Sequence, residues 1–330
     1  MKIIEKSPLI SIIIPIYNPG IEHLKKCIDS VLSQTYVKFE CIAINDGSTD
    51  DTPLILDNYA KLDNRIKVIH KNNGGLSETR NKGLKIARGE WVVIIDSDDW
   101  IEPDYIENFL FADVGSDLVI QSISDYQKDL PTCNIAYHFP EKLWIHDEIA
   151  TLFSDKKMMK YGTTWSRIYK LEIIKEHNLL FNTNFSLKED VLFAHQYLSK
   201  CNKISTVSYF GYHYIYHQTS LSNTVSKHMT FKKIRDVSVY IYISCMNNIF
   251  FRSNKKTKKI ISEILLDALW SSIRIACLNR DLNNKEKILF IKETKNIIRK
   301  YNLYKYMLTT QNSILLLPAH LVYLVNKLKR

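Results

Sequence analysis

The stretch Trp91-Val92-Val93-Ile94-Ile95-Asp96-Ser97-Asp98-Asp99 joins an apolar, β-forming run directly to a tetrapeptide with three carboxylates. Like charges this close repel each other and raise each other's pKa values unless a cation or hydrogen-bond donors neutralise them. A hard divalent ion does so, since Mg²⁺ and Mn²⁺ take a few carboxylate oxygens and complete their shells with phosphates and water. The stretch therefore predicts a buried strand that ends in a site for a metal ion and a phosphorylated substrate.

Strands and helices alternate in the first hundred residues, where apolar runs of the parallel-strand type are separated by residues at helical spacing. The runs cover residues 10–14, 39–44, 65–69 and 91–95. This alternation predicts an α/β fold whose mainly parallel sheet is flanked by helices. Ligands of such sheets bind beyond the carboxyl ends of the strands, so Tyr17-Asn18, Asp46 and Asp96–Asp99 should converge.

The composition predicts a globular cytosolic protein. The chain has 330 residues, 45% of them hydrophobic, enough for one large or two modest domains. Its six cysteines are scattered without a CxxC pair, which favours reduced thiols over a zinc site or disulfide framework. The charged N-terminus is unlike a signal peptide, and no apolar run reaches the roughly 18 to 20 residues of a spanning helix.

The net charge of +10 is unevenly distributed along the chain. Residues 226–330 carry 21 Lys/Arg and 6 Asp/Glu, whereas residues 1–225 carry 24 and 29. The basic, mostly helical last part should meet something anionic: a membrane surface, a lipid-linked phosphate or nucleic acid. No nucleic-acid recognition motif is present, so nucleic acid is not expected. The absence of GxGxxG and of a P-loop disfavours dinucleotide dehydrogenases and P-loop NTPases.

Four segments carry a family resemblance. They read IIIPIYN at 12–18, NDGSTD at 45–50, NGGLS at 73–77 with Arg80-Asn81 beyond, and DSDD at 96–99. In this order they closely resemble the nucleotide-sugar domain of family 2 glycosyltransferases, which have the GT-A fold. The resemblance is strong over about 8–110 and weaker at 188–190 and 214–220. It implies a nucleotide-sugar-binding part at 1–110, an acceptor-binding part at 111–225 and a helical C-terminal region at 226–330.

The resemblance implies a donor site for a UDP-sugar. Tyr17 would stack on the base, and Asp46 would accept a hydrogen bond from a base N–H. Arg80 would hold the nucleotide or order the acids. The plainer alternatives are a strand-end aromatic, a turn aspartate and a surface arginine. The expected donor-binding residues are Pro15, Tyr17, Asn18, Asp46, Asn73, Gly75, Arg80, Asp96 and Ser97.

The implied cofactor is Mn²⁺ or Mg²⁺. Asp98 would bind the ion, Asp96 would contact the ribose, the donor sugar or the ion, and Asp99 would support them. His217 would bind the diphosphate or complete the metal shell, although a lone histidine is more often structural. The segment around it has Ile215 where the family usually has an arginine.

The implied acceptor side centres on Glu189-Asp190. Asp190 would act as general base toward the acceptor hydroxyl, and Glu189 would orient it or bind acceptor. Alternatively, both acids only complement a helix N-terminus. Trp165 would supply a platform for a sugar ring and Arg167 would meet a phosphate, unless they are a core tryptophan and a surface arginine.

The expected function is an inverting transfer from a UDP-sugar to a glycan acceptor. The resemblance and the basic tail together suggest a lipid-diphosphate-linked oligosaccharide, bacterial cell-surface polysaccharide assembly and a peripheral position on the cytoplasmic face of the membrane. The apolar segment 313–325 would lie in the membrane interface or pack on the catalytic domain. Two alternatives are a catalytically silent scaffold that binds nucleotide or membrane, and a nucleotidyltransferase, whose glycine-rich signature is missing.

Overall fold

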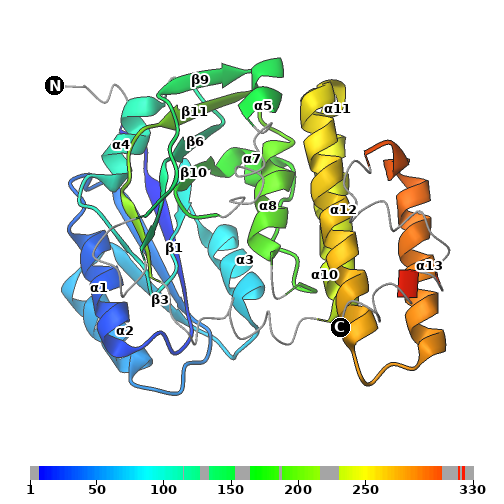
Figure 1. The fold of residues 1–330 in the computed structure, drawn as a ribbon. Helices are drawn as coiled ribbons and strands as arrows, with labels where there is room; N and C mark the ends of the chain where they lie inside the picture. Colours follow the sequence, from blue (N-terminus) through cyan, green and yellow to red (C-terminus); the bar gives the residue numbers. More distant parts are fainter. Residues whose placement is uncertain are drawn as a thin grey trace.

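The computed structural model shows a mixed β-sheet flanked by helices, with further helices packed beside it (Figure 1). The central sheet has eight strands in the order β3-β2-β1-β4-β10-β6-β11-β9, and a smaller sheet has the order β5-β12-β7-β8. These orders refer to the part of the chain that the structure describes. It comprises residues 7–113, 115–126, 134–152, 164–185, 188–215, 230–306, 319, 322 and 323.

Four parallel strands form the half of the sheet that the apolar runs predict. β2 pairs in parallel with β3 and with β1, and β1 pairs in parallel with β4. Every residue of β1 and β2 is buried, as expected for a parallel sheet covered on both faces. The strands are β1 (Ile10–Ile16), β2 (Phe39–Asn45), β3 (Ile66–His70) and β4 (Trp91–Ile94).

β1 continues to Ile16, past the end of the predicted run, although Pro15 has no N–H to donate. The carbonyl of Ile16 accepts from the N–H of Asp46 on the β2 side, so Pro15 faces the β4 side. β4 pairs with β1 only as far as Ile13. The missing N–H therefore falls where no strand is present to use it.

Three helices cover this half: α1 (Ile21–Leu32), α2 (Thr52–Leu62) and α3 (Leu76–Ile86). α3 approaches β1 so closely that a Cβ on Gly83 would lie 2.5 Å from Cγ2 of Ile13. This contact brings the start of α3 to the carboxyl ends of the strands. α1 buries an apolar stripe against the sheet: Leu24, Cys27, Ile28 and Val31.

The second half of the sheet is mixed. β10 (Arg167–Lys170) is antiparallel to both of its neighbours, β4 and β6 (Leu118–Gln121). β11 (Lys203–Val207) is parallel to β6, and β9 (Lys142–Ile145) closes the edge. The other elements of this part are β5 (Trp100–Ile101), β7 (Ile123–Tyr126), β8 (Asn134–Tyr137), β12 (Tyr212–Ile215), α4 (Tyr105–Ala112), α5 (Asp147–Leu152), α7 (Leu171–Glu176) and α8 (Glu189–Leu198).

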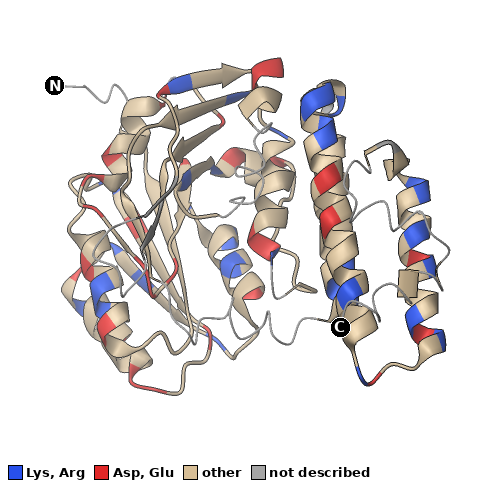
Figure 2. Ribbon diagram, in the orientation of Figure 1, with Lys and Arg blue, Asp and Glu red and all other residues tan. Residues whose placement is uncertain are grey.

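The last helices lie against α8. α10 runs parallel to α8, because Leu192 packs with Val237 near the starts of the two helices and Asn248 Nδ2 donates to the carbonyl of Leu198 at their ends, at 3.1 Å. Ribbon segments coloured blue for Lys and Arg recur along α12 and α13 in Figure 2. The elements are α10 (Phe231–Asn247), α11 (Ile249–Ser253), α12 (Lys255–Leu278), α13 (Asn284–Lys300) and η1 (Leu303–Tyr306).

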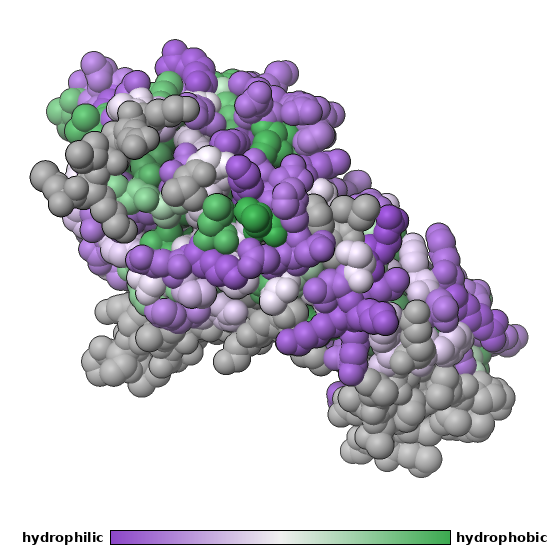
Figure 3. All heavy atoms as spheres, turned by 90° about the horizontal axis from the view of Figure 1, so that it is seen from above, coloured by the Kyte–Doolittle hydropathy of each residue, from purple (hydrophilic) through white to green (hydrophobic). Residues whose placement is uncertain are grey.

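The sequence predicts boundaries between parts of the chain at residues 110 and 225. The sheet runs across residue 110 without a break in its core, and the boundary at 225 lies outside the described residues. None of the helices described combines the length and the apolarity that crossing a membrane requires. The face seen from above is largely hydrophilic, with small apolar patches (Figure 3).

Candidate active site

The acids Asp96–Asp99 form a tight turn after β4. The backbone N–H of Asp99 donates to the carbonyl of Asp96 at 3.1 Å, and Ser97 is buried in the turn. Asp96 and Asp98 are half-buried. Burial, with a contribution from the charge of Asp96, raises the pKa of Asp98 to about 6. The turn thus presents two carboxylates in a partly desolvated place, where a cation would be stabilising.

Asp99 faces the small sheet instead. Its Oδ2 accepts from the hydroxyl of Tyr212 at 2.6 Å, and its Oδ1 accepts from the N–H of Ile215 at 2.8 Å. The side chain is buried, and burial together with the charges of Asp98 and Asp96 raises its pKa. Both oxygens of Asp99 therefore hold β12 beside the turn rather than a ligand.

The acids of the turn fit a hard divalent ion such as Mn²⁺ or Mg²⁺. Mg²⁺ is usually bound through one or two carboxylates and the phosphates of a substrate, not through a closed cage of side chains. Among the described residues, no group of three or more His, Cys, Asp or Glu could hold a metal ion. His217, expected to complete the shell, lies outside the described residues.

Asp46 shapes the glycine loop that follows β3. Its Oδ1 accepts from Lys71 Nζ at 2.5 Å and from the N–H of Gly74 at 2.8 Å, and its Oδ2 accepts from the N–H of Gly75 at 2.8 Å. Burial acts to raise the pKa of Asp46, but these donors outweigh it and keep the pKa below its ordinary value. The loop that carries Asn73 and Gly75, both expected at the donor, is thereby fixed.

Asn18 connects the loops that follow β1 and β2. Its Oδ1 accepts from the N–H of Thr49 at 2.9 Å, and its own N–H donates to Ser48 Oγ at 3.1 Å. Its φ of 45° lies in the left-handed region, which asparagine tolerates better than most residues. The neighbouring Tyr17 is 51% exposed, as stacking on a ligand requires.

Arg80 on α3 links the acids of the turn to those of α8. Its Nη2 donates to Asp96 Oδ1 at 2.9 Å, and its Nη1 donates to Glu189 Oε1 at 2.8 Å. The guanidinium is buried over the ring of Phe181, 5.2 Å from its centroid. Burial acts to lower the pKa of Arg80, but the charges of the acids outweigh it and raise the pKa. Of the two roles that the sequence left open, these contacts fit the ordering of the acids.

The acid pair stands at the start of α8, on the same side of the molecule as the turn. Glu189 is buried against Arg80, whereas Asp190 is half-buried and accepts from the N–H of Val191 at 2.7 Å. Burial and the charge of Glu189 raise the pKa of Asp190 to about 7, and Arg80 opposes this shift. The charge of Asp96 also acts on Asp190, so the two acidic clusters lie in one electrostatic environment.

Trp165 and Arg167 lie in the interior. Trp165 is 8% exposed and stacks on Tyr212 and Tyr214, with ring centroids 5.4 Å and 5.8 Å away. Arg167 is 1% exposed, because β10 is an internal strand covered on both faces. Burial lowers the pKa of Arg167, against the opposing charge of Asp190. The core alternative is right for Trp165, and the expectation of a surface arginine is wrong.

Three contributors were not predicted: Lys71, Tyr212 and His23. Lys71 directly follows β3, so the rule that ligands gather at the carboxyl ends of strands could have found it. Tyr212 belongs to a strand that the sequence pattern did not reveal. His23 lies on the first turn of α1, where its charge acts to lower the pKa of Asp98, and no motif marks it.

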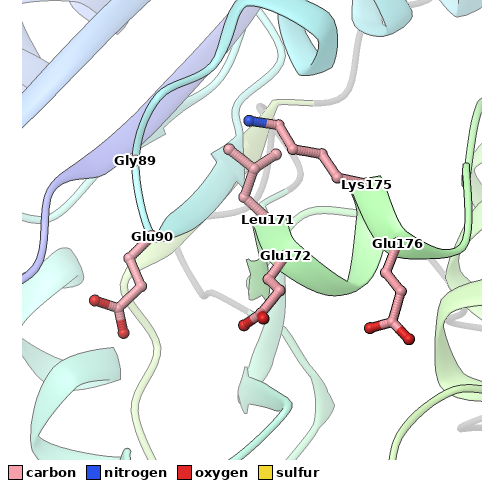
Figure 4. A pocket seen from close by; sticks show the side chains of 6 residues that line it. All are labelled: Gly89, Glu90, Leu171, Glu172, Lys175 and Glu176. Atoms are coloured by element: carbon pink, nitrogen blue, oxygen red, sulfur yellow. The ribbon is translucent and has the colours of Figure 1, made fainter.

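A pocket of about 580 Å³ lies away from the acids of the candidate site (Figure 4). Gly89 and Glu90, which form part of its wall, precede β4, whereas the acids follow that strand. The pocket is therefore at the opposite end of β4 and does not belong to the site. Its lining consists of Gly89, Glu90, Leu171, Glu172, Lys175 and Glu176.

Comparisons with known proteins agree with this geometry. The sequence model of "Glycosyl transferase family 2" matches residues 11–177. EpsH of Bacillus subtilis (strain 168), which carries the name of a glycosyltransferase, is 34% identical over 272 residues, covering 78% of this chain and 74% of EpsH.

Two solved structures share the fold. S. aureus TarS 1-349 in complex with UDP-GlcNAc has a TM-score of 0.73 at 20% identity, covering 97% of this chain and 91% of TarS. The mannosyltransferase PcManGT from Pyrobaculum calidifontis, in complex with GDP-Man and Mn²⁺, has a TM-score of 0.56 at 14% identity, covering 98% and 88%.

Proposed function

Because the chain belongs to glycosyl transferase family 2 and is a glycosyltransferase with the GT-A fold, we propose that it moves a sugar from a UDP-sugar to a hydroxyl of a glycan acceptor, with inversion. The observation that carries this proposal is the pair of hydrogen bonds from Arg80, which hold donor-side Asp96 and acceptor-side Glu189 around one guanidinium. Family membership sets aside the scaffold and the nucleotidyltransferase.

The donor side would bind nucleotide, diphosphate and metal ion. Tyr17 would stack on the base, and the loop held by Asp46 would close around the nucleoside. Asp98 and Asp96 would hold Mn²⁺ or Mg²⁺, the bound ion supplying positive charge against the departing diphosphate. Support comes from TarS, bound to UDP-GlcNAc, and from PcManGT, bound to Mn²⁺.

The acceptor side would supply the base. Asp190 would take the proton of the acceptor hydroxyl while its oxygen bonds to the anomeric carbon and the bond to the diphosphate breaks on the opposite face. A pKa of about 7 suits this role, because the carboxylate is populated at neutral pH yet basic enough to accept a proton. Glu189, fixed by Arg80, would keep the start of α8 in place.

The proposed acceptor and its place in the cell follow from the basic C-terminal part of the chain. We propose that the acceptor is a lipid-diphosphate-linked oligosaccharide in bacterial cell-surface polysaccharide assembly, used at the cytoplasmic face of the membrane. The support is the basic segment 226–330, with 21 Lys/Arg against 6 Asp/Glu, since each basic residue near an anionic surface contributes about 1 kcal/mol. Most of segment 313–325 lies outside the described residues.

Donor hydrolysis tests the core of the proposal. Wild-type protein with Mn²⁺ is expected to release UDP from a UDP-sugar, EDTA should stop the release, and Asp98→Ala should reduce it about 100-fold or more. Glu176→Ala removes an exposed acid at the other end of β4 and should leave the rate unchanged. Undiminished release by Asp98→Ala would contradict the metal assignment.

A further inference from the structure

Two lysines have no carboxylate partner among the described residues: one directly before the acceptor-side acids and one in the first turn of α10. Lys188 and Lys233 are both exposed. The contrast is Arg235, two residues further along α10, which pairs with Asp236 at 2.9 Å and with Glu293 at 3.0 Å. The two lysine charges are thus available to an anion from outside the protein.

The packing of α8 on α10 brings these lysines to one end of the helix pair. The helices are parallel, and Leu192 packs with Val237 across them. Lys188 directly precedes α8, and Lys233 is the third residue of α10. Because the two helices are parallel, both lysines stand at the end of the pair that carries Asp190.

The backbone of Lys188 gives a second indication. Its φ of 61° and ψ of 16° place a residue with a Cβ in the left-handed region, directly before the catalytic acid pair. Such strain costs free energy and is concentrated at functional sites. Although the residue as a whole is exposed, the surrounding protein partly desolvates the ammonium group of Lys188 and lowers its pKa. The charge of Asp190 opposes this shift, so the lysine lies within electrostatic reach of that acid.

We propose that Lys188 and Lys233 bind a phosphate group of the acceptor, next to the hydroxyl that Asp190 deprotonates. The inference rests on the proposed function and assigns two residues of the chain to the phosphate of its acceptor. Arg80 already neutralises Glu189, which leaves Asp190 as the acid nearest to Lys188. Exposed Lys232, beside Lys233, adds positive charge at the same helix end.

Calorimetric titration of protein saturated with UDP and Mg²⁺ tests this, because the donor phosphate site is then filled. The probes are inorganic phosphate, geranyl diphosphate, and phosphatidylglycerol vesicles compared with phosphatidylcholine vesicles. The double variant Lys188→Gly, Lys233→Ala should bind the phosphate probes about tenfold or more weakly, since two charge-assisted hydrogen bonds are lost. Lys285→Ala, which removes an exposed lysine of α13, is the control.

The outcomes distinguish two sources of the bound phosphate, a lipid-linked diphosphate and a phosphate on the glycan. Tighter binding of geranyl diphosphate than of phosphate indicates a lipid-linked diphosphate, whereas equal binding indicates a phosphate on the glycan, and both support the proposal. Equal affinity of wild type and double variant would overturn it, as would a loss confined to UDP or to the anionic vesicles. Lys188→Gly should unfold at the wild-type temperature or above, since glycine adopts this φ without strain. Failure of wild type to bind UDP would instead refute the proposed function.

Discussion

Arg80 Nη1 donates to Glu189 Oε1 at 2.8 Å across 109 positions of sequence, and its Nη2 holds Asp96 Oδ1 at 2.9 Å. The side chains of Arg80 and Glu189 are only 3% and 7% exposed, so water and salt screen the pair little. The spacing between the acids that would receive the donor and those that would activate the acceptor therefore depends on one guanidinium.

Replacing Arg80 by methionine should destabilise the fold by about 3 to 5 kcal/mol, because Glu189 is left buried without its partner. Urea unfolding measures this. The double variant Arg80→Met, Glu189→Met should recover most of the stability but not the transferase activity. A cost below about 1 kcal/mol for the single variant would mean that the bridge is not buried as described.

The pH dependence of transfer should follow Asp190. As the base must be ionised, kcat/KM should rise with pH and level off above an apparent pKa of about 7. Asp190→Asn should lower the rate about 10²- to 10⁴-fold and remove this limb. A pH profile retained in the variant would assign the titration to another group.

Asp190 should also leave a signature in stability. Its pKa is raised in the folded state from 3.8 to about 7, so the folded protein holds a proton that the unfolded chain releases between these values. The contribution of Asp190 to the free energy of unfolding therefore decreases as the pH rises from 3.8 to about 7. Asp190→Asn should be more stable than wild type at pH 8 and indistinguishable at pH 3.5, as measured by thermal unfolding.

Tyr212→Phe should cost about 1 to 3 kcal/mol, since Asp99 loses a buried donor at 2.6 Å and keeps only the N–H of Ile215. UDP release should fall as well, because the same hydroxyl accepts from the N–H of Asp96 at 3.2 Å. Tyr240→Phe, at an exposed tyrosine, is the matched control and should change stability by less than about 0.5 kcal/mol. Equal effects of the two variants would contradict the structural role of Asp99.

Asp46→Ala should weaken UDP binding about tenfold or more, because the loop that carries Gly74 and Gly75 loses its shared acceptor. Calorimetry with UDP measures the change. Asp51→Ala removes an exposed acid that makes no capping hydrogen bond at the start of α2 and should bind UDP normally. If Asp46→Ala bound UDP as tightly as wild type does, this loop would not belong to the donor site.

The N-terminal half of the fold was predictable because its signals are local. Continuous apolar runs separated by residues at helical spacing predicted β1 to β4 and the helices between them. The resemblance added the GT-A fold, which the comparisons confirm. The strand-end rule predicted that Tyr17-Asn18, Asp46 and Asp96–Asp99 converge, and the hydrogen bonds of Asn18 join the loops after β1 and β2. The bridge that Arg80 makes between Asp96 and Glu189 was not part of that prediction.

The second half was less predictable because its strands are short and their places are decided by tertiary contacts. β10 has four residues and lies between β4 and β6, far from both in sequence, so nothing local marks Arg167 as buried. Trp165 stacks on rings that follow it by more than forty positions, which spacing alone does not reveal. The roles proposed for individual site residues stay predictions until they are measured.

α8, which carries the proposed base Asp190, packs in parallel on α10, from Leu192 with Val237 to the hydrogen bond between Leu198 and Asn248. α8 is therefore shared by the two parts of the chain. Exchanging the C-terminal helices between relatives would therefore disturb the reaction centre unless α8 is transplanted with them. Relatives that use different acceptors should accordingly differ by paired substitutions at the contact between α8 and α10, rather than by isolated substitutions in only one of these helices.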